Sequence, residues 1–336
     1  MQRFHRVFVI LVTVLVSTGI CGCGSSGTLS RDVSSSQKTA ETVIGISFPT
    51  MQLAYRAKMR DLVQTAYPEG NDKGIRLIIK DADGSQTRQN QDIMDLVDLN
   101  VDGIVLIPYT TEGPVSAVRY ANERGIPVIT VDNTLEADSG AEVISYVGAD
   151  HREMGREAAE LLLQILEEKL PDRDQWNVIE FAGSPGASGT IDREYGINAV
   201  LGSNHKINML ATYNAEFMTK NAKSVMDDCL KVYDSIDAVI CQNDLMALGC
   251  YYSLREAGKL GRIVIVGIDG QRDVVEKMVS GGIDGTVFQN PDMILTGIEK
   301  LTDYLSGETI LPLYYQPTYI IEKADAQKYL INALPW

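Results

Sequence analysis

The chain has 336 residues, of which 45% are hydrophobic and 22% are charged, a composition typical of a folded globular protein. This length is sufficient for two domains. The formal net charge of −15 argues against binding to nucleic acid or to anionic lipid through charge alone. We therefore expect no nucleic-acid partner, and we expect any link to a membrane to be covalent.

Residues 1–22 have the pattern of an export signal. Arg3 and Arg6 precede an apolar run over residues 7–16, and a stretch of small residues follows. The apolar run is shorter than a typical transmembrane helix. An uncleaved anchor remains the alternative to a cleaved signal peptide, and both place the body of the protein outside the cytoplasmic membrane.

The sequence Ile-Cys-Gly-Cys at residues 20–23 resembles the bacterial lipobox, with Gly22 before the acceptor Cys23. We expect cleavage after Gly22 and attachment of lipid to Cys23, which would anchor the protein to the cell membrane. Residues 23–41 are rich in Ser, Gly and Thr and are expected to form a flexible tether.

Three further cysteines, Cys229, Cys241 and Cys250, lie in the body of the chain. They form no CxxC pair, so the sequence does not indicate a zinc or redox site. We expect them to be buried free thiols, and we expect no metal and no cofactor.

Strand and helix patterns alternate from residue 42 onward. In the first half the expected strands are 43–47, 75–79, 103–107, 127–131 and 143–147, and the expected helices are 52–67, about 88–99 and 114–124. This alternation is typical of a parallel sheet with helices on both faces.

A second array of the same kind follows. Its expected helices are 151–169, 190–201, 217–233, 244–257 and 271–280, and its expected strands are 177–181, 207–213, 238–241, 263–266 and 285–289. Two arrays of similar size predict an α/β protein with two similar lobes.

Acidic residues follow three of the predicted strands. Asp132 follows the strand at 127–131, Asp244 follows the strand at 238–241, and Asp269 follows a strand that begins near residue 263. The carboxyl ends of parallel strands are where open α/β sheets bind ligands, so these acids are candidates for one polar cleft. The alternative is that some of them only cap helices.

A glycine-rich turn over residues 183–189 lies between a predicted strand and a predicted helix. Its spacing is GxxGxxG and no Walker sequence is present, so nucleotide binding is not favoured. We expect these glycines to let the backbone approach a ligand closely. Arg193, in the helix that follows, offers a planar set of donors suited to hydroxyl or carboxylate oxygens, unless it pairs with Asp192 or Glu194.

No catalytic residue is indicated. The histidines, at positions 5, 151 and 205, belong to no GxSxG or HExxH setting. The carboxylates of Asp132 and Asp244 could perform acid–base chemistry, but they could equally accept hydrogen bonds from sugar hydroxyls. Recognition of a ligand fits this set of acids, amides and one arginine better than catalysis does.

Several motifs, taken in order, resemble the ribose/galactose-type (type I) periplasmic sugar-binding proteins of ATP-binding cassette importers. They are Tyr55-Arg56, Val131-Asp132-Asn133, Gly186-Ala187-Ser188 with Ile191-Asp192-Arg193, Gln242-Asn243-Asp244 with Met246-Ala247-Leu248-Gly249, Gly267-Ile268-Asp269-Gly270, and Gln289-Asn290-Pro291-Asp292. The resemblance covers about residues 42–330. Ala82-Asp83-Gly84 and the segment from Gly186 to Arg193 look closest to the galactofuranose-binding branch.

This resemblance implies two Rossmann-like lobes with parallel sheets, joined by a three-segment hinge. The N-terminal lobe would contain residues 42–147 and 290–317, and the C-terminal lobe residues 148–289 and 318–336. A monosaccharide would bind between the lobes and be enclosed when they close.

The resemblance also implies a set of ligand-binding residues. They are Tyr55, Arg56, Asp132, Asn133, Arg193, Phe217, Asn243, Asp244 and Gln289. The aromatic rings would stack on the sugar, Asp132 and Asp244 would accept hydroxyl protons, and Arg193 would donate. Hydrophobic packing is the alternative for Phe217. The family often has Arg where this chain has Asn133, which leaves the identity of the sugar open.

The leading functional prediction is a lipid-anchored receptor that delivers a monosaccharide to the permease of an importer. The alternative is a sugar-sensing partner of a membrane histidine kinase or chemoreceptor. A sugar-responsive repressor shares the lobe fold, but it needs an N-terminal helix-turn-helix where this chain has an export signal.

Overall fold

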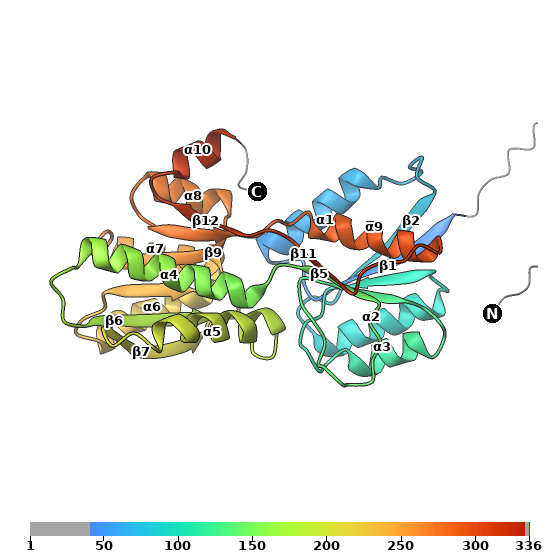
Figure 1. The fold of residues 1–336 in the computed structure, drawn as a ribbon, viewed down its shortest axis with the longest axis horizontal. Coiled ribbons are helices and arrows are strands. Elements are labelled where there is room, and N and C mark those ends of the chain that lie inside the picture. Colours follow the sequence, from blue (N-terminus) through green and yellow to red (C-terminus); the bar gives the residue numbers. More distant parts are fainter. Residues whose placement is uncertain (1–40, 333–335) are drawn as a thin grey trace, which may run out of the picture. The chain divides into compact units, whose positions relative to one another are not determined.

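The computed structural model describes residues 41–332 and residue 336. These described residues belong to one compact unit, which contains two six-stranded sheets (Figure 1). The expected signal peptide, the lipidated Cys23 and nearly all of the expected tether lie outside the described residues. No helix in the described part of the chain is long and apolar enough to cross a membrane.

The first sheet has the strand order β11-β5-β4-β3-β1-β2, and all of its pairs are parallel. Its strands are β1 (Thr42–Phe48), β2 (Ile75–Asp81), β3 (Gly103–Leu106), β4 (Val128–Val131), β5 (Ser145–Gly148) and β11 (Leu313–Tyr315). Strands β3 and β4 are buried along their whole length because helices cover both faces of the sheet.

Four helices cover this sheet, and together they form the first lobe with it. They are α1 (Ala54–Ala66), α2 (Gln86–Asp98), α3 (Val115–Asn122) and α9 (Met293–Leu305). Helix α9 packs on β3, β4 and β5 and against α1, so a late segment of the chain completes the early lobe (Figure 1). Helices α2 and α3 pack against each other; α2 contacts β1 and β2, and α3 contacts β4.

The second sheet has the strand order β12-β10-β9-β8-β6-β7. Its strands are β6 (Trp176–Ala182), β7 (Ile207–Asn214), β8 (Ala238–Cys241), β9 (Val264–Asp269), β10 (Gly285–Phe288) and β12 (Tyr319–Glu322). The strongly apolar β8 and β9 are fully buried at its centre.

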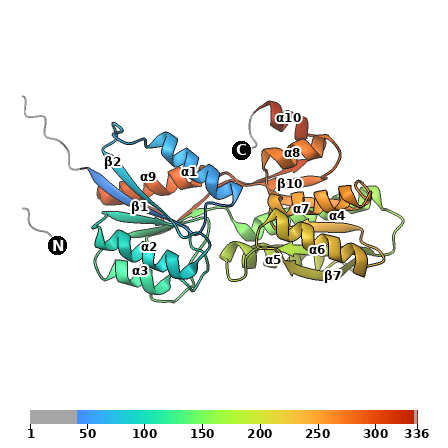
Figure 2. The same cartoon turned by 180° about the vertical axis from the view of Figure 1, so that it is seen from behind.

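Six helices complete the second lobe. They are α4 (His151–Lys169), α5 (Ser188–Leu201), α6 (Thr219–Val232), α7 (Asp244–Glu256), α8 (Arg272–Val279) and α10 (Ala326–Ile331). Helix α4 packs on β8, β9, β10 and β12 with α5 beside it, and α7 packs on β8 and β9 with α6 beside it. Figures 1 and 2 show the sheet from these two sides.

The predicted α/β class with two lobes is confirmed, and three details differ from the sequence predictions. Strand β12 runs antiparallel to β10, so the second sheet is not wholly parallel. Phe217 precedes α6 instead of starting it, because its backbone has the left-handed φ of 61°. Periodicity did not predict α9, β11, β12 and α10 as individual elements.

The chain passes between the two sheets at three places within the described residues. It leaves β5 for α4 at residues 149–150, leaves β10 for α9 at residues 289–292, and leaves β11 for β12 at residues 316–318. The first two crossovers start at the carboxyl ends of parallel strands, where ligand sites of open α/β sheets lie.

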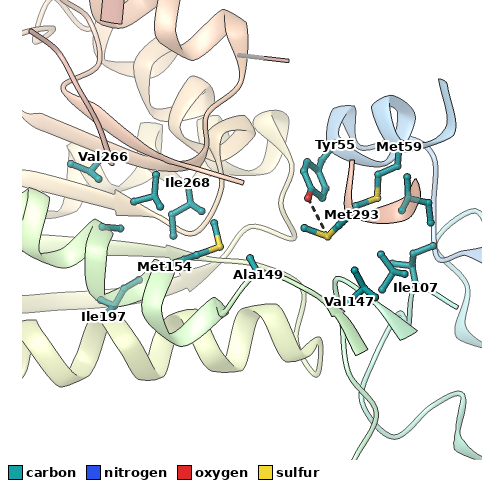
Figure 3. Close-up of a cluster of buried hydrophobic side chains, with 14 of the residues drawn as sticks. Tyr55, Met59, Ile107, Val147, Ala149, Met154, Ile197, Val266, Ile268 and Met293 are labelled. Carbon is teal, nitrogen blue, oxygen red and sulfur yellow. Dashed lines mark hydrogen bonds between the residues drawn. The ribbon is translucent and has the colours of Figure 1, made fainter. Parts of the chain in front are cut away.

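A cluster of buried apolar side chains continues through these crossovers. It runs from Met59 and Val147 in the first lobe, past Ala149, to Met154 and Ile268 in the second (Figure 3). Met293 also belongs to it, and its sulfur lies 3.5 Å from the Tyr55 hydroxyl. The apolar core is therefore continuous across the hinge, beside the polar residues described below.

Helices α4 and α5 touch through two glycines. A Cβ atom at Gly155 would overlap the main-chain carbonyl of Arg193, and one at Gly196 would overlap the main-chain carbonyl of Arg152. The absence of side chains at these two positions allows the close approach of the helices. This contact fixes the backbone from which the Arg193 side chain projects.

Replacement of Gly155 by Ala is expected to destabilise the fold. The overlap with Arg193 should cost about 1–3 kcal/mol, which exceeds the roughly 1 kcal/mol that Ala gains over Gly in a helix. Urea unfolding monitored by circular dichroism measures this change. Glu167→Ala, at an exposed position of the same helix, is the control and should change stability by less than about 0.5 kcal/mol. A Gly155→Ala chain as stable as the wild type would contradict the prediction.

Candidate ligand-binding site

A small cavity of about 40 Å³ lies where the two lobes meet. Both lobes contribute its walls, from α1, the end of β4, the crossovers, α5 and the ends of β8 and β9. The lining residues are Leu53, Tyr55, Arg56, Asp132, Asn133, His151, Gly189, Arg193, Phe217, Asn243, Leu245, Asp269, Gln271 and Gln289. The structure thus brings together every residue of the predicted set except Asp244.

Asp132 and Arg56 form the polar wall of the first lobe. Asp132 follows β4 with a φ of 65°, a left-handed conformation that Asp tolerates better than most residues. An Arg56 Nη2 atom lies 2.5 Å from its Oδ2, and both side chains are less than 10% exposed. Burial alone would raise the pKa of Asp132, but the charges of Arg56 and Arg193 hold that pKa below its usual value. Asp132 is therefore a buried, ionised acceptor.

His151 was not predicted as part of the site. It is the first residue of α4, directly after a crossover, and its Nε2 lies 2.7 Å from the main-chain oxygen of Asp132. Burial and the charge of Arg193 lower the pKa of His151, so the ring is neutral and Nε2–H donates to that oxygen. Its position after the predicted strand at 143–147 was the one sequence signal that could have indicated it.

Arg193 is the main donor of the second lobe. Its Nη1 donates to the main-chain oxygen of Gln242 and its Nη2 to Oε1 of Gln289, each at 2.5 Å. The Asp269 carboxylate lies 3.7 Å away. Among the described residues, the buried Nε of Arg193 has no hydrogen-bond partner. The alternative for Arg193, a surface pair with Asp192 or Glu194, is not formed, and Asp192 pairs with Arg152 instead.

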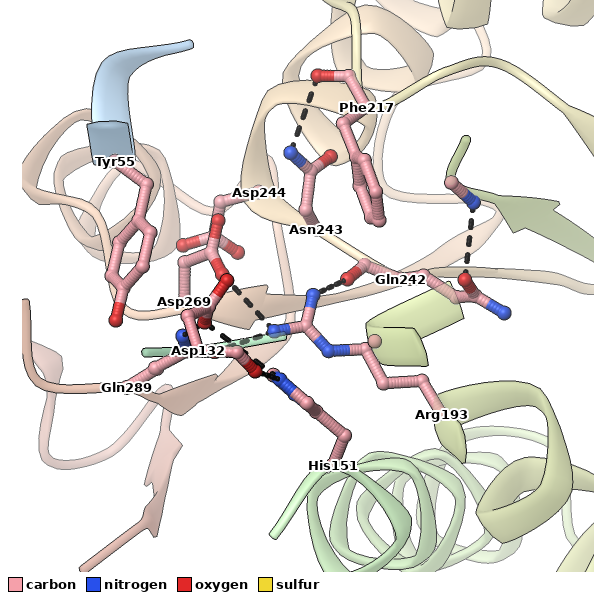
Figure 4. A network of polar contacts seen from close by, with 12 residues as sticks. Tyr55, Asp132, His151, Arg193, Phe217, Gln242, Asn243, Asp244, Asp269 and Gln289 are labelled. Carbon is pink, nitrogen blue, oxygen red and sulfur yellow. Dashed lines mark hydrogen bonds and ion pairs between the residues drawn. The ribbon is translucent and has the colours of Figure 1, made fainter. Parts of the chain in front are cut away.

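Gln289 connects the charged groups of the two lobes. Its Nε2 donates to Oδ1 of Asp132 at 2.5 Å, while its Oε1 accepts from Arg193 (Figure 4). The residue lies at the carboxyl end of β10, at the start of a crossover. One neutral amide therefore bridges a carboxylate of the first lobe and a guanidinium of the second.

Asp244, which we expected to accept hydroxyl protons from a ligand, does not line the cavity. It is fully buried behind Asp269, where Oδ2 accepts from the main-chain N–H of Gln271 and Oδ1 from the hydroxyl of Thr286, both at 2.7 Å. Burial and the charge of Asp269 raise the pKa of Asp244 well above its usual value. A Cβ atom at Gly267 would overlap Oδ1, so this glycine makes room for the acid.

Asp269, and not Asp244, is the acidic residue of the second lobe that lines the cavity. It ends β9, lines the cavity and has a φ of 130°, which is rare for a residue with a side chain. Burial raises the pKa of Asp269 to about 6, although the charge of Arg193 opposes this shift. Its Oδ2 also accepts from the side chain of Gln271 at 3.2 Å. The sequence had indicated Asp269 as a candidate for the polar cleft, but the resemblance did not place it among the ligand-binding residues.

Two aromatic rings border the cavity. The Tyr55 hydroxyl donates to the main-chain oxygen of Asn290 at 3.2 Å, which orients its ring. The Phe217 ring lies against Gly183, where any side chain would overlap it. Asn243 donates to the main-chain oxygen of Phe217 at 3.2 Å and also caps α7 (Figure 4). These rings can offer flat apolar surfaces on either side of a polar ligand.

The glycine-rich turn contacts the first lobe. Asn133 Oδ1 accepts from the Ser188 hydroxyl at 3.3 Å and from the Gly189 N–H at 3.2 Å, while its Nδ2 donates to Pro108 in its own lobe. The main-chain N–H of Thr111 also donates to the oxygen of Gly186 at 2.9 Å. These bonds hold the two lobes together at one side of the cavity.

The inner cavity, of about 40 Å³, is not isolated in this conformation. A second cavity of about 220 Å³ shares Leu53, Arg56, Asn133 and Phe217 with it. The two cavities therefore adjoin, and together they offer more room than the inner cavity alone.

Comparison with known proteins gives consistent matches. A family model described as a periplasmic binding protein domain matches residues 44–309, which include strands of both sheets. The ribose import binding protein of Escherichia coli is 29% identical over 291 residues, which cover 86% of this chain and 93% of that protein. The galactofuranose-binding protein of the same organism is 26% identical over 287 residues, covering 84% and 88%.

A solved structure resembles the whole described fold. It is a protein from Mycobacterium smegmatis in complex with beta-D-fucofuranose, with 25% sequence identity and a TM-score of 0.82. The similarity covers 87% of this chain and 95% of that one.

Replacement of Asp244 by Ala is expected to destabilise the protein. The change leaves the buried Gln271 N–H and Thr286 hydroxyl without their acceptor, which should cost about 2–4 kcal/mol of unfolding free energy. Denaturant unfolding measures the loss. Asp174→Ala, at an exposed loop position, is the control and should stay within about 0.5 kcal/mol of the wild type. Equal stability of the two variants would show that Asp244 has no structural role.

Proposed function

The chain belongs to the periplasmic binding protein family, and from this membership and its site we propose that it captures a monosaccharide outside the cytoplasm and delivers it to an ATP-binding cassette importer. The observation that carries the proposal is the convergence of Asp132, Arg193 and Asp269, which come from distant parts of the chain, on one cavity between two lobes. The expectation that the protein is not an enzyme is confirmed by this membership.

The chemistry of the cavity suits a sugar. Sugars have polar rims that donate and accept hydrogen bonds and apolar C–H faces. Asp132 and Asp269 offer acceptors for hydroxyl protons, and Arg193 offers donors, including its unpartnered Nε. Tyr55 and Phe217 offer flat apolar surfaces for the faces of the ring. Ribose, galactofuranose and fucofuranose in the names of the similar proteins support a pentose or hexose as the ligand class.

The mechanism that we propose is hinge opening followed by closure on the ligand. The three crossovers permit one lobe to rotate relative to the other, and the Asn133–Ser188 and Thr111–Gly186 contacts lie across the gap that must open. A sugar that bonds to Asp132 in the first lobe and to Arg193 and Asp269 in the second stabilises the closed state, because it binds that state better than the open one.

A screen of pentoses and hexoses by thermal shift and calorimetry tests this proposal. A true ligand should raise the melting temperature in proportion to occupancy. Asp269→Asn keeps the shape of the side chain but removes a charged acceptor, so it should weaken binding by about 10- to 100-fold. Wild-type affinity should also fall as the pH drops through about 6, where Asp269 becomes protonated, and the Asn variant should lack this step.

Stability against unfolding should have the opposite pH dependence to that of sugar affinity. The pKa of Asp269 is raised on folding, so its contribution to stability is lost as the pH rises from about 4 toward and through 6, and the Asn variant should not be less stable at pH 7.5. Absence of binding by every sugar, or an Asp269→Asn variant with unchanged affinity, would contradict the assigned site.

Delivery itself is tested by reconstitution with the permease. Stimulation of its ATPase activity supports the importer, whereas stimulation of a membrane kinase supports the sensing alternative.

We further propose that Cys23 carries the lipid anchor, on the basis of the Ile-Cys-Gly-Cys sequence. Cys23→Ser should release the body of the protein from the membrane fraction or leave the precursor uncut. Mass spectrometry of the mature protein gives the first residue and its modification. Cys21→Ser is the matched control and should remain anchored. A mature chain that begins at another residue would contradict this proposal.

A further inference from the structure

Trp336 lies against residues of the candidate site. Its indole Nε1 is 3.1 Å from the main-chain oxygen of Asp269 and 3.2 Å from that of Gln289. Its own main-chain oxygen accepts from the N–H of Arg272, at the start of α8, at 3.0 Å. Its ring packs edge-on against Tyr55, with centroids 5.1 Å apart and an interplanar angle of 61°.

The two carbonyls that the indole contacts belong to cavity residues. Asp269 ends β9 and Gln289 directly follows β10, and the Gln289 N–H donates to the Asp269 oxygen at 3.0 Å. The Asp269 carboxylate lies 3.7 Å from Arg193, and the Gln289 side chain is hydrogen bonded to both Arg193 and Asp132. One indole N–H therefore restrains the backbone at both points from which these side chains leave the second lobe.

The contact with Tyr55 crosses from one lobe to the other. Tyr55 belongs to α1 of the first lobe, whereas the hydrogen-bond partners of Trp336 belong to the second lobe and its crossover. If the lobes separate as proposed above, a Trp336 that keeps its bonds to the second lobe would lose its packing against Tyr55.

We propose that Trp336 is a positioning residue for sugar binding: it holds the Tyr55 ring against the ligand and stabilises the closed state. This inference rests on the proposed function. A phenylalanine would keep part of the packing but lose the bonds to Asp269 and Gln289, and an alanine would lose both. The described contacts predict roughly tenfold weaker binding for Trp336→Ala and an intermediate value for Trp336→Phe.

The chain offers a matched control. Its other tryptophan, Trp176, is fully buried at the start of β6 and donates to the main-chain oxygen of Leu170 at 3.1 Å. It does not line the cavity. Trp176→Phe should therefore lower the melting temperature without changing sugar affinity, whereas the Trp336 variants should change affinity more than stability.

The experiment labels both tryptophans of the wild-type protein with 5-fluorotryptophan and follows their two fluorine NMR signals during titration with the sugar that the screen selects. Trp336→Phe identifies which signal belongs to Trp336. We expect the Trp336 signal to shift as sugar is added, along a titration curve whose dissociation constant equals the one measured by calorimetry. The Trp176 signal should not shift. Affinities of the variants are measured by calorimetry on the same samples.

The outcomes separate this inference from the proposed function. A wild-type chain that binds its sugar while the Trp336 signal is unchanged, or a Trp336→Ala chain with wild-type affinity, overturns the inference and leaves the proposed function intact. A wild-type chain that binds no sugar overturns both. A shift of the Trp336 signal together with weaker binding of both Trp336 variants supports the inference.

Discussion

The pairing of the buried Asp132 carboxylate is the constraint on which the site depends. Transfer of an unpaired carboxylate from water into a protein interior costs several kcal/mol, so its partners must be held in place. One carboxylate oxygen of Asp132 pairs with Arg56 of α1, and the other accepts a hydrogen bond from Gln289 in the crossover after β10. His151, the first residue of α4, donates a hydrogen bond to the main-chain oxygen of Asp132. Segments that lie far apart in sequence are thus joined at one acid.

The charges around the cavity balance one another in this conformation. Arg56 and Arg193 face the carboxylates of Asp132 and Asp269, while His151 is neutral and burial favours the protonated form of Asp244. A ligand must replace these internal hydrogen bonds with equally good ones, since a buried donor or acceptor left without a partner costs about 1–3 kcal/mol. A sugar that lacks one hydroxyl would leave such a group unpaired, and this is how a self-paired site discriminates between similar ligands.

Local patterns predicted most of the fold, and long-range packing decided the rest. The alternation of strands and helices was visible because each element has its own periodicity. The distinction between Asp244 and Asp269 was not visible, because both follow apolar strands that are neighbours in the sheet. The backbone at Asp269, with its φ of 130°, and the space left by Gly267 decide which acid reaches the cavity. Neither property can be read from spacing, and the same holds for the antiparallel β12, whose partner lies far away in sequence.

Asn133 shows how one departure from a family pattern changes what a position can do. An arginine, which the resemblance leads one to expect there, has only donors, whereas an asparagine side chain both donates and accepts. Asn133 uses its oxygen to accept from Ser188 and Gly189 of the opposite lobe. An arginine at this place could not accept either bond and would bring a second guanidinium near Arg56. In this conformation Asn133 therefore bonds the two lobes to each other. Under the proposed function, recognition of sugar hydroxyls would then fall to Arg56, Asp132, Arg193 and Asp269.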